Sequence, residues 1–310
     1  MLIALAGGVG AARFLRGLIA TTPPGDVLVI GNTGDDLRIH GLHVSPDLDS
    51  VSYTLAGLGD DERGWGLAGE TWNVLGALDR LGEPSWFGLG DRDLATHLLR
   101  TRLLHEGQPL SAVTAELGRR LGVPVRLVPM TDDPVETRVE VDGPDGVEDL
   151  GFQEYWVGRK AADPVRRVRF AGVESARPAP GLLDAIAAAD GIVICPSNPV
   201  VSIAPILAVP GLRDAIAAAG CRTVAISPIV GGAPVRGMAD KLLPAWGAEV
   251  SAAGVAGLYA GLADVYVLDQ VDAGQAAAVE ALGLEAVVTQ TIMTTVADAA
   301  ALAKTAIERL

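Results

Sequence analysis

Short apolar runs that alternate with helical segments constrain the fold of this chain more than any other feature. The runs that we interpret as strands are Leu2–Ala6, Val27–Ile30, Ile192–Cys195, Thr223–Ile226, Val265–Leu268 and Ala286–Val288. Segments with helical spacing of apolar residues lie between most of them. Repeated strand-helix units form a parallel sheet that is flanked by helices and joined by right-handed crossovers. We therefore predict an α/β fold with a doubly wound, mostly parallel, Rossmann-like sheet.

The middle of the chain departs from this alternation. Thr137–Val141 and Val147–Val157 alternate apolar and polar residues on either side of the turn Asp142-Gly143-Pro144-Asp145-Gly146. This pattern is typical of an antiparallel hairpin, and Arg166–Val173 is a candidate third strand. We expect a single α/β domain over residues 1–310, with a smaller insertion of antiparallel strands and helices at approximately residues 125–175.

Composition excludes several classes of protein. The chain has 310 residues, a net charge of -14 and no basic stretch, so it does not offer a surface for nucleic acid. The amino terminus lacks a basic region, its first apolar run ends in glycines, and no window of twenty apolar residues follows. We expect a cytoplasmic protein that does not bind a membrane. The only cysteines, Cys195 and Cys221, are interpreted as small buried residues.

A cluster of acids directly follows the predicted strand Val27–Ile30. The polar residues of this stretch are Asn32, Asp35, Asp36, His40, His43, Asp47 and Asp49. Ligands bind at the carboxyl end of parallel strands, and crowded carboxylates repel one another unless a cation lies among them. Carboxylate oxygens suit Mg²⁺, so we predict a cation that holds a phosphate-bearing ligand. The alternative is structural, because Asp and Asn are frequent turn and cap residues and Ser45-Pro46-Asp47 resembles the first turn of a helix Leu48–Leu58.

A glycine loop follows the first predicted strand. Gly7, Gly8 and Gly10 precede a helical pattern over Ala11–Ala20, an arrangement whose backbone N–H groups can bind a phosphate. The loop lacks the Gly-Lys-Ser/Thr ending of a Walker A motif. It also departs from the dinucleotide fingerprint, because Arg13 stands at the third glycine position. Arg13 is a candidate phosphate ligand, and the alternative is a plain turn beside a solvated arginine.

Two further regions supply candidate ligand contacts. Ser197, Asn198 and Ser202 lie in a loop, Pro196–Ser202, after the strand Ile192–Cys195. In a parallel sheet this loop meets the glycine loop and the loop Asn32–Asp36 at one edge. Trp65 and Trp72 are candidates for the wall of a pocket for a flat aromatic ligand, although core packing is the commoner use of tryptophan.

The segment Trp86–Asp93 is the second aromatic candidate. It is expected to end a strand, with Gly88 and Gly90 allowing a ligand to approach the backbone. Asp91 or Asp93 is then a candidate cap for a helix Leu94–Leu104. Residue chemistry alone thus predicts a metal-assisted α/β enzyme that acts on a nucleotide phosphate, because phosphoryl transfer needs a phosphate cradle, a cation and a positioned nucleophile.

The order and the amino-acid sequences of the motifs resemble those of one family over nearly the whole chain. The motifs are GGVGAARFL, GNTGDD, HVSPDLDSVSYTL, GETWN, WFGLGDRDLATHLL, MTDDPVET, FQEYWVG, PSNPVVSIAPIL and SPIVGGAPVRGMADKL. Together they are similar to the 2-phospho-L-lactate transferase family of coenzyme F-420 biosynthesis. The resemblance implies a Mg²⁺-dependent transferase. A ribityl hydroxyl of the deazaflavin Fo attacks the phosphorus distal to guanosine in a guanosine diphospho-lactate or diphospho-enolpyruvate donor, and GMP leaves.

The resemblance also implies roles for particular residues. Asp49 and Asp35 are the expected catalytic residues, and Asp35, Asp47 and Asp49 the expected metal ligands. Asp49, Trp65, Asp91 and the backbone at Gly88 are placed beside the deazaflavin. The donor's phosphates and guanosine are assigned to Gly7, Gly8, Gly10, Arg13, Asn32, Ser197, Asn198 and Ser202. On this assignment, Asp49→Asn is expected to abolish transfer and leave the fold intact.

At two positions the sequence differs from that of other family members, and each difference bears on how a substrate is expected to bind. Val9-Gly10-Ala11-Ala12-Arg13 stands where other branches have Thr-Gly-Thr-Pro-Lys, and Gly88 stands where some relatives have Lys or Arg. The first departure resembles the bacterial, phosphoenolpyruvate transferase-like branch, which implies an enolpyruvyl donor. The second leaves only a main-chain contact at Gly88.

Two other functions are alternatives to the transferase. A Rossmann oxidoreductase for NAD or flavin requires the glycine fingerprint that Arg13 interrupts. A non-catalytic nucleotide-sensing protein needs no second pocket for an aromatic ligand. We also expect a homodimer, with the antiparallel insertion and Val255–Leu262 as candidate contact faces.

Overall fold

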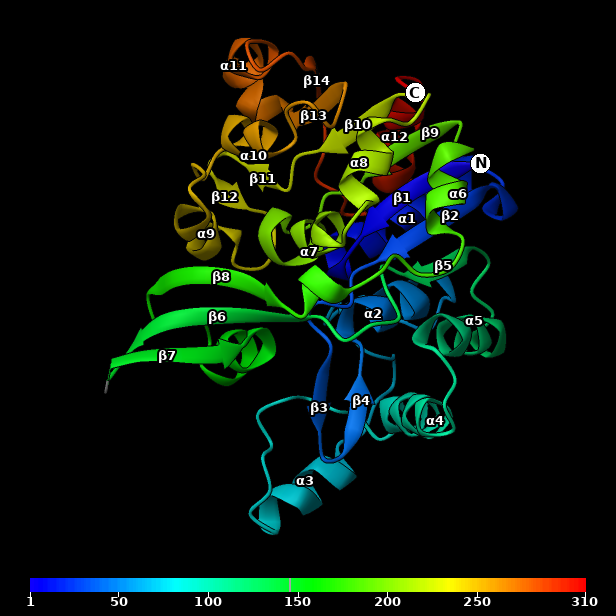
Figure 1. Ribbon diagram of the computed structural model, residues 1–310, viewed down its shortest axis with the longest axis vertical. Helices are drawn as coiled ribbons and strands as arrows, with labels where there is room; N and C mark the ends of the chain where they lie inside the picture. Colours follow the sequence, from blue (N-terminus) through cyan, green and yellow to red (C-terminus); the bar gives the residue numbers. More distant parts are fainter. Residues whose placement is uncertain (145) are drawn as a thin grey trace.

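A seven-stranded sheet forms the centre of the molecule, in the order β14-β13-β10-β9-β1-β2-β5 (Figure 1). The computed structural model describes residues 1–144 and 146–310. All neighbouring strands of this sheet are parallel, so the predicted α/β fold is confirmed. The strands are β1 (Leu2–Ala6), β2 (Val27–Gly31), β5 (Arg126–Pro129), β9 (Gly191–Ile194), β10 (Thr223–Ile226), β13 (Val265–Asp269) and β14 (Glu285–Thr289).

Burial on both faces explains why the central strands are continuous apolar runs. In β1, Ile3 and Leu5 belong to the hydrophobic cluster on one face of the sheet. Ala4 and Ala6, which alternate with them, belong to the cluster on the other face. Each central strand therefore packs against a layer of helices on both of its faces.

The helices cover both faces of the sheet. Those that contribute to the cluster with Ala4 and Ala6 are α1 (Gly8–Thr21), α2 (Pro46–Leu55), α5 (Leu110–Leu121) and α12 (Val296–Ile307). Those that contribute to the opposite cluster are α6 (Leu182–Ala187), α7 (Ala204–Ala208), α8 (Leu212–Ala217), α9 (Ala239–Leu242), α10 (Ala252–Leu258) and α11 (Ala276–Glu280). No helix of the described residues is long and apolar enough to span a bilayer.

The strand order reverses beside β1, which places a topological switch point there. The chain leaves β1 towards β2 and β5 on one side, and later returns to β9 on the other side. In open α/β sheets a crevice forms at the carboxyl end of the strands where the order reverses. The segments that follow β1 and β9 therefore face each other across this crevice.

A three-stranded antiparallel sheet projects from the body, as Figure 1 shows in green. Its order is β7-β6-β8, with β6 at Glu136–Gly143, β7 at Gly146–Gly151 and β8 at Val165–Ala171. The predicted hairpin and third strand are confirmed, although Asp145 of the predicted turn lies outside the described residues. The predicted end of β7 at Val157 is wrong, because the chain leaves the sheet after Gly151 and forms a π-helical turn over Glu154–Gly158.

Two local predictions are wrong, and one element was not predicted. The segment after β9 is helical, with a π-helical turn over Pro199–Ile203 that leads into α7. The stretch after β2 contains a small hairpin, β3 (Leu37–Ile39) and β4 (Leu42–Val44). Trp86 and Phe87 lie in a loop rather than at the end of a strand.

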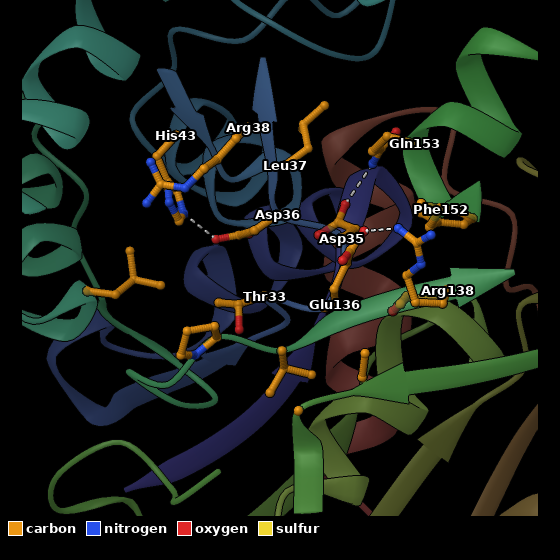
Figure 2. A pocket seen from close by; sticks show the side chains of 18 of the residues that line it. Thr33, Asp35, Asp36, Leu37, Arg38, His43, Glu136, Arg138, Phe152 and Gln153 are labelled. Atoms are coloured by element: carbon orange, nitrogen blue, oxygen red, sulfur yellow. Dashed lines mark hydrogen bonds and ion pairs between the residues drawn. The ribbon is translucent and has the colours of Figure 1, made fainter. Parts of the chain in front are cut away.

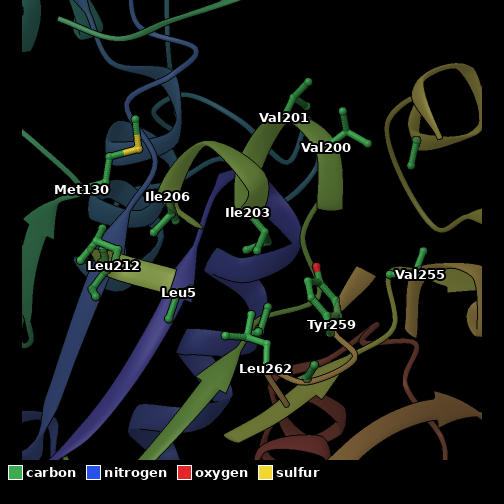
Figure 3. Close-up of a cluster of buried hydrophobic side chains, with 14 of the residues drawn as sticks. Leu5, Met130, Val200, Val201, Ile203, Ile206, Leu212, Val255, Tyr259 and Leu262 are labelled. Carbon is green, nitrogen blue, oxygen red and sulfur yellow. The ribbon is translucent and has the colours of Figure 1, made fainter. Parts of the chain in front are cut away.

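From the sequence, Val255–Leu262, on and after helix α10, is a candidate contact face of a homodimer. The apolar side chains of this segment are instead buried in the core. Val255, Tyr259 and Leu262 have at most 5% of their surface exposed. Figure 3 shows them in the same cluster as Leu5 and Ile203. Burial of these side chains against the sheet therefore removes the apolar face expected at Val255–Leu262. A second pair of short strands, β11 (Ile229–Val230) and β12 (Ala233–Pro234), precedes α9.

Candidate functional site

A cavity of about 700 Å³ opens at the switch point. The beginning of α1, the turn after β9 and the segment after β12 line one part of it. The loops that carry Trp65 and Phe87, with the turn after β7, line the other part. Segments far apart in the sequence therefore meet around one space, as the predicted convergence of loops requires.

Most of the candidate donor-site residues line this cavity, namely Gly7, Gly8, Gly10, Arg13, Ser197, Asn198 and Ser202. The glycines permit close packing that a side chain would prevent. A Cβ atom on Gly7 would lie 2.5 Å from a carboxylate oxygen of Asp47, and one on Gly10 would lie 2.3 Å from the carbonyl oxygen of Pro196. The three glycines are not a separate loop, because α1 begins at Gly8. Close packing thus brings the start of a helix, where partial positive charge accumulates, against the acid cluster.

Asn32 holds the acid cluster together and is itself fully buried. Its side-chain amide lies 2.9 Å from Asp47 Oδ2, 3.0 Å from the carbonyl oxygen of Val201 and 3.4 Å from Asp35 Oδ1. Its own Oδ1 accepts a hydrogen bond from the N–H of Gly34. These three oxygens occupy the side-chain amide of Asn32. Asn32 therefore positions the acids and is not among the residues that line the cavity. Asn198 also has a structural role, since its Oδ1 accepts hydrogen bonds from Val200 N and Val201 N.

The carboxylates of Asp35 and Asp47 are buried beside each other, and both line the cavity. Burial, followed by the negative charges of Asp47 and Asp36, raises the pKa of Asp35 well above its ordinary value. Burial, with the charge of Asp36, raises the pKa of Asp47 to about 7. Two carboxylates that are so costly to ionise together fit a bound cation, which would relieve the repulsion.

The donor set for a metal is smaller than predicted. Within residues 1–144 and 146–310, no group of three or more His, Cys, Asp or Glu side chains has the geometry to hold a metal alone. Mg²⁺ commonly takes only one or two carboxylates and completes its coordination with water and substrate phosphates. Asp35 and Asp47 therefore fit a Mg²⁺ that is shared with a phosphate.

Asp49 does not join this pair. Its carboxylate forms a two-point ion pair with the guanidinium of Arg100, with Arg100 Nη1 3.1 Å from Asp49 Oδ2 and Nη2 donating to Oδ1. Both side chains are less than 10% exposed. Burial works against the charged guanidinium, yet the pKa of Arg100 is raised because Asp49 pairs with it. The structure thus separates Asp49 from the predicted metal ligands, although Asp49 still lines the cavity.

The ion pair continues into a buried network on α4 (Asp93–His105). Arg100 Nη1 lies 3.2 Å from His97 Nδ1, and His97 Nε2 lies 3.2 Å from Asp93 Oδ2. The hydroxyl of Tyr53 on α2 donates to Asp93 Oδ1. The network fixes Asp49 in one orientation on the wall of the cavity.

Asp36 points to the other side of the cluster, into a second cavity of about 880 Å³ (Figure 2). His43 Nε2 lies 2.8 Å from Asp36 Oδ2, and the hydroxyl of Ser45 donates to the same oxygen. Figure 2 also shows Gln153, whose amide donates to Asp35 Oδ2 at 3.0 Å. Asp35 and Gln153 line both cavities, so they form part of the wall between them.

The aromatic part of the first cavity contains Trp65, Phe87, Gly88 and Trp156. A Cβ atom on Gly88 would lie 3.0 Å from the ring of Trp65, so the absence of a side chain lets this ring cover the backbone. Trp72, the other candidate for the wall of the pocket, is not among the residues that line the cavity; it directly precedes α3 (Asn73–Arg80) and is 36% exposed. The guanidinium of Arg63 lies 5.2 Å from the Trp65 ring and 5.3 Å from the Trp72 ring.

Asp91 lies outside the residues that line the cavity and caps α3 instead. Its carboxylate accepts hydrogen bonds from the N–H groups of Asn73 and Val74 and from the hydroxyl of Thr71. These bonds hold the pKa of Asp91 below its ordinary value. The predicted cap of α4 is also different, because Glu70 accepts from the N–H groups of Arg92 and Asp93.

Sequence reasoning missed Arg100 and the three cavity residues Lys160, Arg236 and Gln153. A signal for Arg100 exists, since Asp93, His97 and Arg100 recur at the spacing of one helix face and are all buried. Lys160 carries no such pattern, and its backbone is left-handed, with φ 55°. Arg236 and Gln153 reach the cavity through tertiary packing alone.

A doubly wound parallel sheet with glycine, acid and serine segments at its switch point defines a Rossmann-like α/β protein that binds its ligand at the carboxyl edge. The profile of the family described as 2-phospho-L-lactate transferase CofD matches residues 2–304, so the chain belongs to this family. It is therefore a transferase of coenzyme F-420 biosynthesis. This membership displaces the oxidoreductase and non-catalytic alternatives.

Relatives and solved structures agree with this assignment. A phosphoenolpyruvate transferase of Streptomyces griseus is 53% identical over 99% of this chain and 97% of that protein. A phosphoenolpyruvate transferase of Kitasatospora aureofaciens is 52% identical over 99% of this chain and 96% of that protein. The crystal structure of a UPF0052 family protein from Bacillus halodurans shares the fold, with 18% identity, a TM-score of 0.66, and coverage of 99% of this chain and 98% of that one.

Proposed function

We propose that this transferase moves a phosphoenolpyruvyl group from guanosine diphospho-enolpyruvate to the deazaflavin Fo and releases GMP. The product is dehydro coenzyme F-420-0, and Mg²⁺ is the cofactor. The names of the relatives from Streptomyces and Kitasatospora support the enolpyruvyl group over the 2-phospho-L-lactyl group. The expected cytoplasmic location and homodimer stay predictions.

One observation carries the proposal, namely that a single cavity has two chemically different halves. One half contains the start of α1, the serines after β9 and the buried acids Asp35 and Asp47. The other half contains Trp65, Phe87 and Trp156. A phosphate-bearing donor suits the first half, and a flat aromatic acceptor suits the second. The space between them is where a phosphoryl group would pass from donor to acceptor.

The residues of the chain bind and orient the two reactants. Backbone N–H groups at Gly8 and Gly10 face the donor's diphosphate, the N–H of Gly7 donates to Ser197 Oγ, and the ring of Trp65 stacks on the acceptor. Asp49, held by Arg100, accepts the hydrogen bond of the attacking hydroxyl. The new bond joins the hydroxyl oxygen to the phosphorus distal to guanosine, the bond between this phosphorus and the bridging oxygen breaks, and the electron pair leaves with GMP. The hydroxyl proton passes to a nearby carboxylate or to water.

Asp35 and Asp47 would hold the Mg²⁺, with Asn32 fixing both carboxylates. When bound, the cation supplies positive charge against the diphosphate and the departing GMP. Asp91 has no part in this scheme, because its carboxylate is committed to the cap of α3.

The proposal is tested by incubating the purified protein with Fo, Mg²⁺ and each donor separately, followed by mass spectrometry of the product. We expect a product that carries the enolpyruvyl group, equimolar GMP, and slower turnover with guanosine diphospho-lactate. Asp35→Asn should reduce turnover at least about a hundredfold, because a charged metal ligand is lost. Asp184→Asn, an exposed change on α6, is the matched control. Full turnover by Asp35→Asn would remove Asp35 from the metal site.

A further inference from the structure

Three basic residues line the first cavity and form no ion pair within residues 1–144 and 146–310, in a chain whose net charge is -14. They are Arg13 on α1, Lys160 after the π-helical turn, and Arg236 after β12. Most arginines of the described residues have a carboxylate within ion-pair distance, for example Arg138 and Arg159. Within the same residues, Arg13 and Arg236 have none. A cavity that keeps its cations unpaired among so many acids is suited to an anion.

Arg236 is positioned by main-chain contacts rather than by an acid. Its Nη2 donates to the carbonyl oxygen of Arg63. Its guanidinium also packs on the backbone of Gly64, where a Cβ atom would lie 2.0 Å from Nη1. Gly64 adopts φ +74° and precedes Trp65. Arg236 therefore sits beside the aromatic half of the cavity with donors still available.

Arg13 approaches the same space from the phosphate half. It lies on α1 soon after Gly7, Gly8 and Gly10, and it lines the cavity. Burial and, second, repulsion by the nearby charge of Arg13 lower the pKa of Arg236. An anion between them would turn this repulsion into two charge-assisted contacts.

We propose that Arg13 and Arg236 form the subsite for the transferred group, that is, for its phosphoryl oxygens and its carboxylate. This inference rests on the proposed function. Arg13 borders the diphosphate half of the cavity and Arg236 borders the aromatic half, and the transferred group has to pass from one half to the other. Guanidiniums bind carboxylate and phosphoryl oxygens through two parallel hydrogen bonds, so the pair selects a donor that carries an acidic acyl group. Arg236 is a binding residue in this scheme.

The test compares steady-state kinetics of the full-length protein and its variants at saturating Mg²⁺. Arg236→Gln should raise the KM for the guanosine diphospho-enolpyruvate donor about ten- to a hundredfold, as for the loss of a charged hydrogen-bond donor. The inhibition constant of GMP should not change, because GMP lacks the transferred group. Arg236→Lys should recover part of the donor KM, and Arg13→Gln should resemble Arg236→Gln. Arg213→Gln, an exposed change on α8, is the control.

In the alternative role, Arg236 only fixes the position of the loop that carries Trp65. The same kinetic data distinguish this role from the subsite. If Arg236→Gln raises the KM for Fo and leaves the donor KM at the wild-type value, Arg236 only holds the loop and the subsite is wrong. An unchanged donor KM in Arg236→Gln, with an active wild type, overturns the subsite and leaves the proposed function standing. A wild type that turns over neither donor overturns the proposed function and the subsite together. Thermal melting of each variant checks that it is folded.

Discussion

At the scale of single residues, the acids after β2 form three partnerships rather than one metal cluster. Asp36 pairs with His43 and Ser45, and Asp49 pairs with Arg100. Asp35 and Asp47 are joined by Asn32. The sequence predicted that these residues gather at one edge of the sheet, because all of them follow one strand. It did not predict their pairing, because Arg100 lies on a distant helix and its orientation depends on how α4 packs against α2.

Removal of one partner of the Asp49–Arg100 pair is expected to destabilise the fold. Arg100→Gln should lower the free energy of unfolding by about 3–5 kcal/mol, because it leaves a buried carboxylate without its counter-charge. The measurement is urea unfolding at neutral pH. Arg119→Gln breaks an exposed pair with Glu116 and should change the free energy of unfolding far less, because solvent screens the pair.

The same reasoning changes the expectation for Asp49→Asn, which should impair both stability and turnover. A cost near zero for Arg100→Gln would show that the pair is solvated and would restore the expectation of an intact fold.

At the scale of elements, the strands that are buried on both faces are the ones that the sequence predicts best. The central strands β1, β2, β9, β10 and β13 were recognised because both of their faces are buried and their sequences are continuously apolar. The hairpin β3–β4 was missed because each strand has three residues and its polar side chains resemble a loop. Helix α3 has apolar residues at helical spacing, yet none of its residues is buried. Its apolar spacing is real, but no layer of the sheet lies beneath it.

The contact between α1 and α12 gives a test at this scale. A Cβ atom on Gly17 of α1 would lie 2.2 Å from the backbone of Ala299 on α12, so Gly17→Ala has to push the two helices apart. We expect a loss of about 1–3 kcal/mol in the free energy of unfolding, measured by chemical denaturation.

The matched control is Gly76→Ala on α3, where the nearest atom to the new Cβ is the end of Arg80 at 3.8 Å. This change should stabilise by up to about 1 kcal/mol, because alanine favours a helix. Equal effects of the two substitutions would contradict the close contact.

At the scale of the whole molecule, the site depends on the junction of two sheets. The parallel sheet supplies the acids and the phosphate half, and the antiparallel sheet leads into the turn that carries Gln153 and Trp156. The sequence predicted both sheets, and most of the residues assigned to the donor line the cavity. The contributions of Gln153, Lys160 and Arg236 depend on how these parts pack, and no local pattern encodes that packing.

The contribution of the buried acids Asp35 and Asp47 to the stability of the metal-free protein should fall as pH rises from about 4 to about 7. Burial raises the pKa of Asp47 from the ordinary 3.8 to about 7, so the folded state binds more protons than the unfolded state across this interval. The contribution of Asp47 present below about pH 4 is lost as pH rises through its folded pKa, by about 4 kcal/mol. Asp35 acts in the same direction.

The measurement is urea unfolding in EDTA at several pH values. Asp47→Asn should weaken the pH dependence, and addition of Mg²⁺ should do the same in the wild type, because a cation compensates the ionised carboxylates. A pH dependence that is the same in the wild type and in Asp47→Asn would contradict the buried pair.

The placement of tryptophan gives the molecule an optical reporter of its own. Of the five tryptophans in the chain, Trp65 and Trp156 line the first cavity and Trp86 lines the second. Trp246 instead packs on Phe170, with ring centroids 5.6 Å apart. A chromophore that enters the first cavity would quench part of the ultraviolet emission and leave a constant background from Trp246. Occupancy can therefore be followed by fluorescence titration without a label.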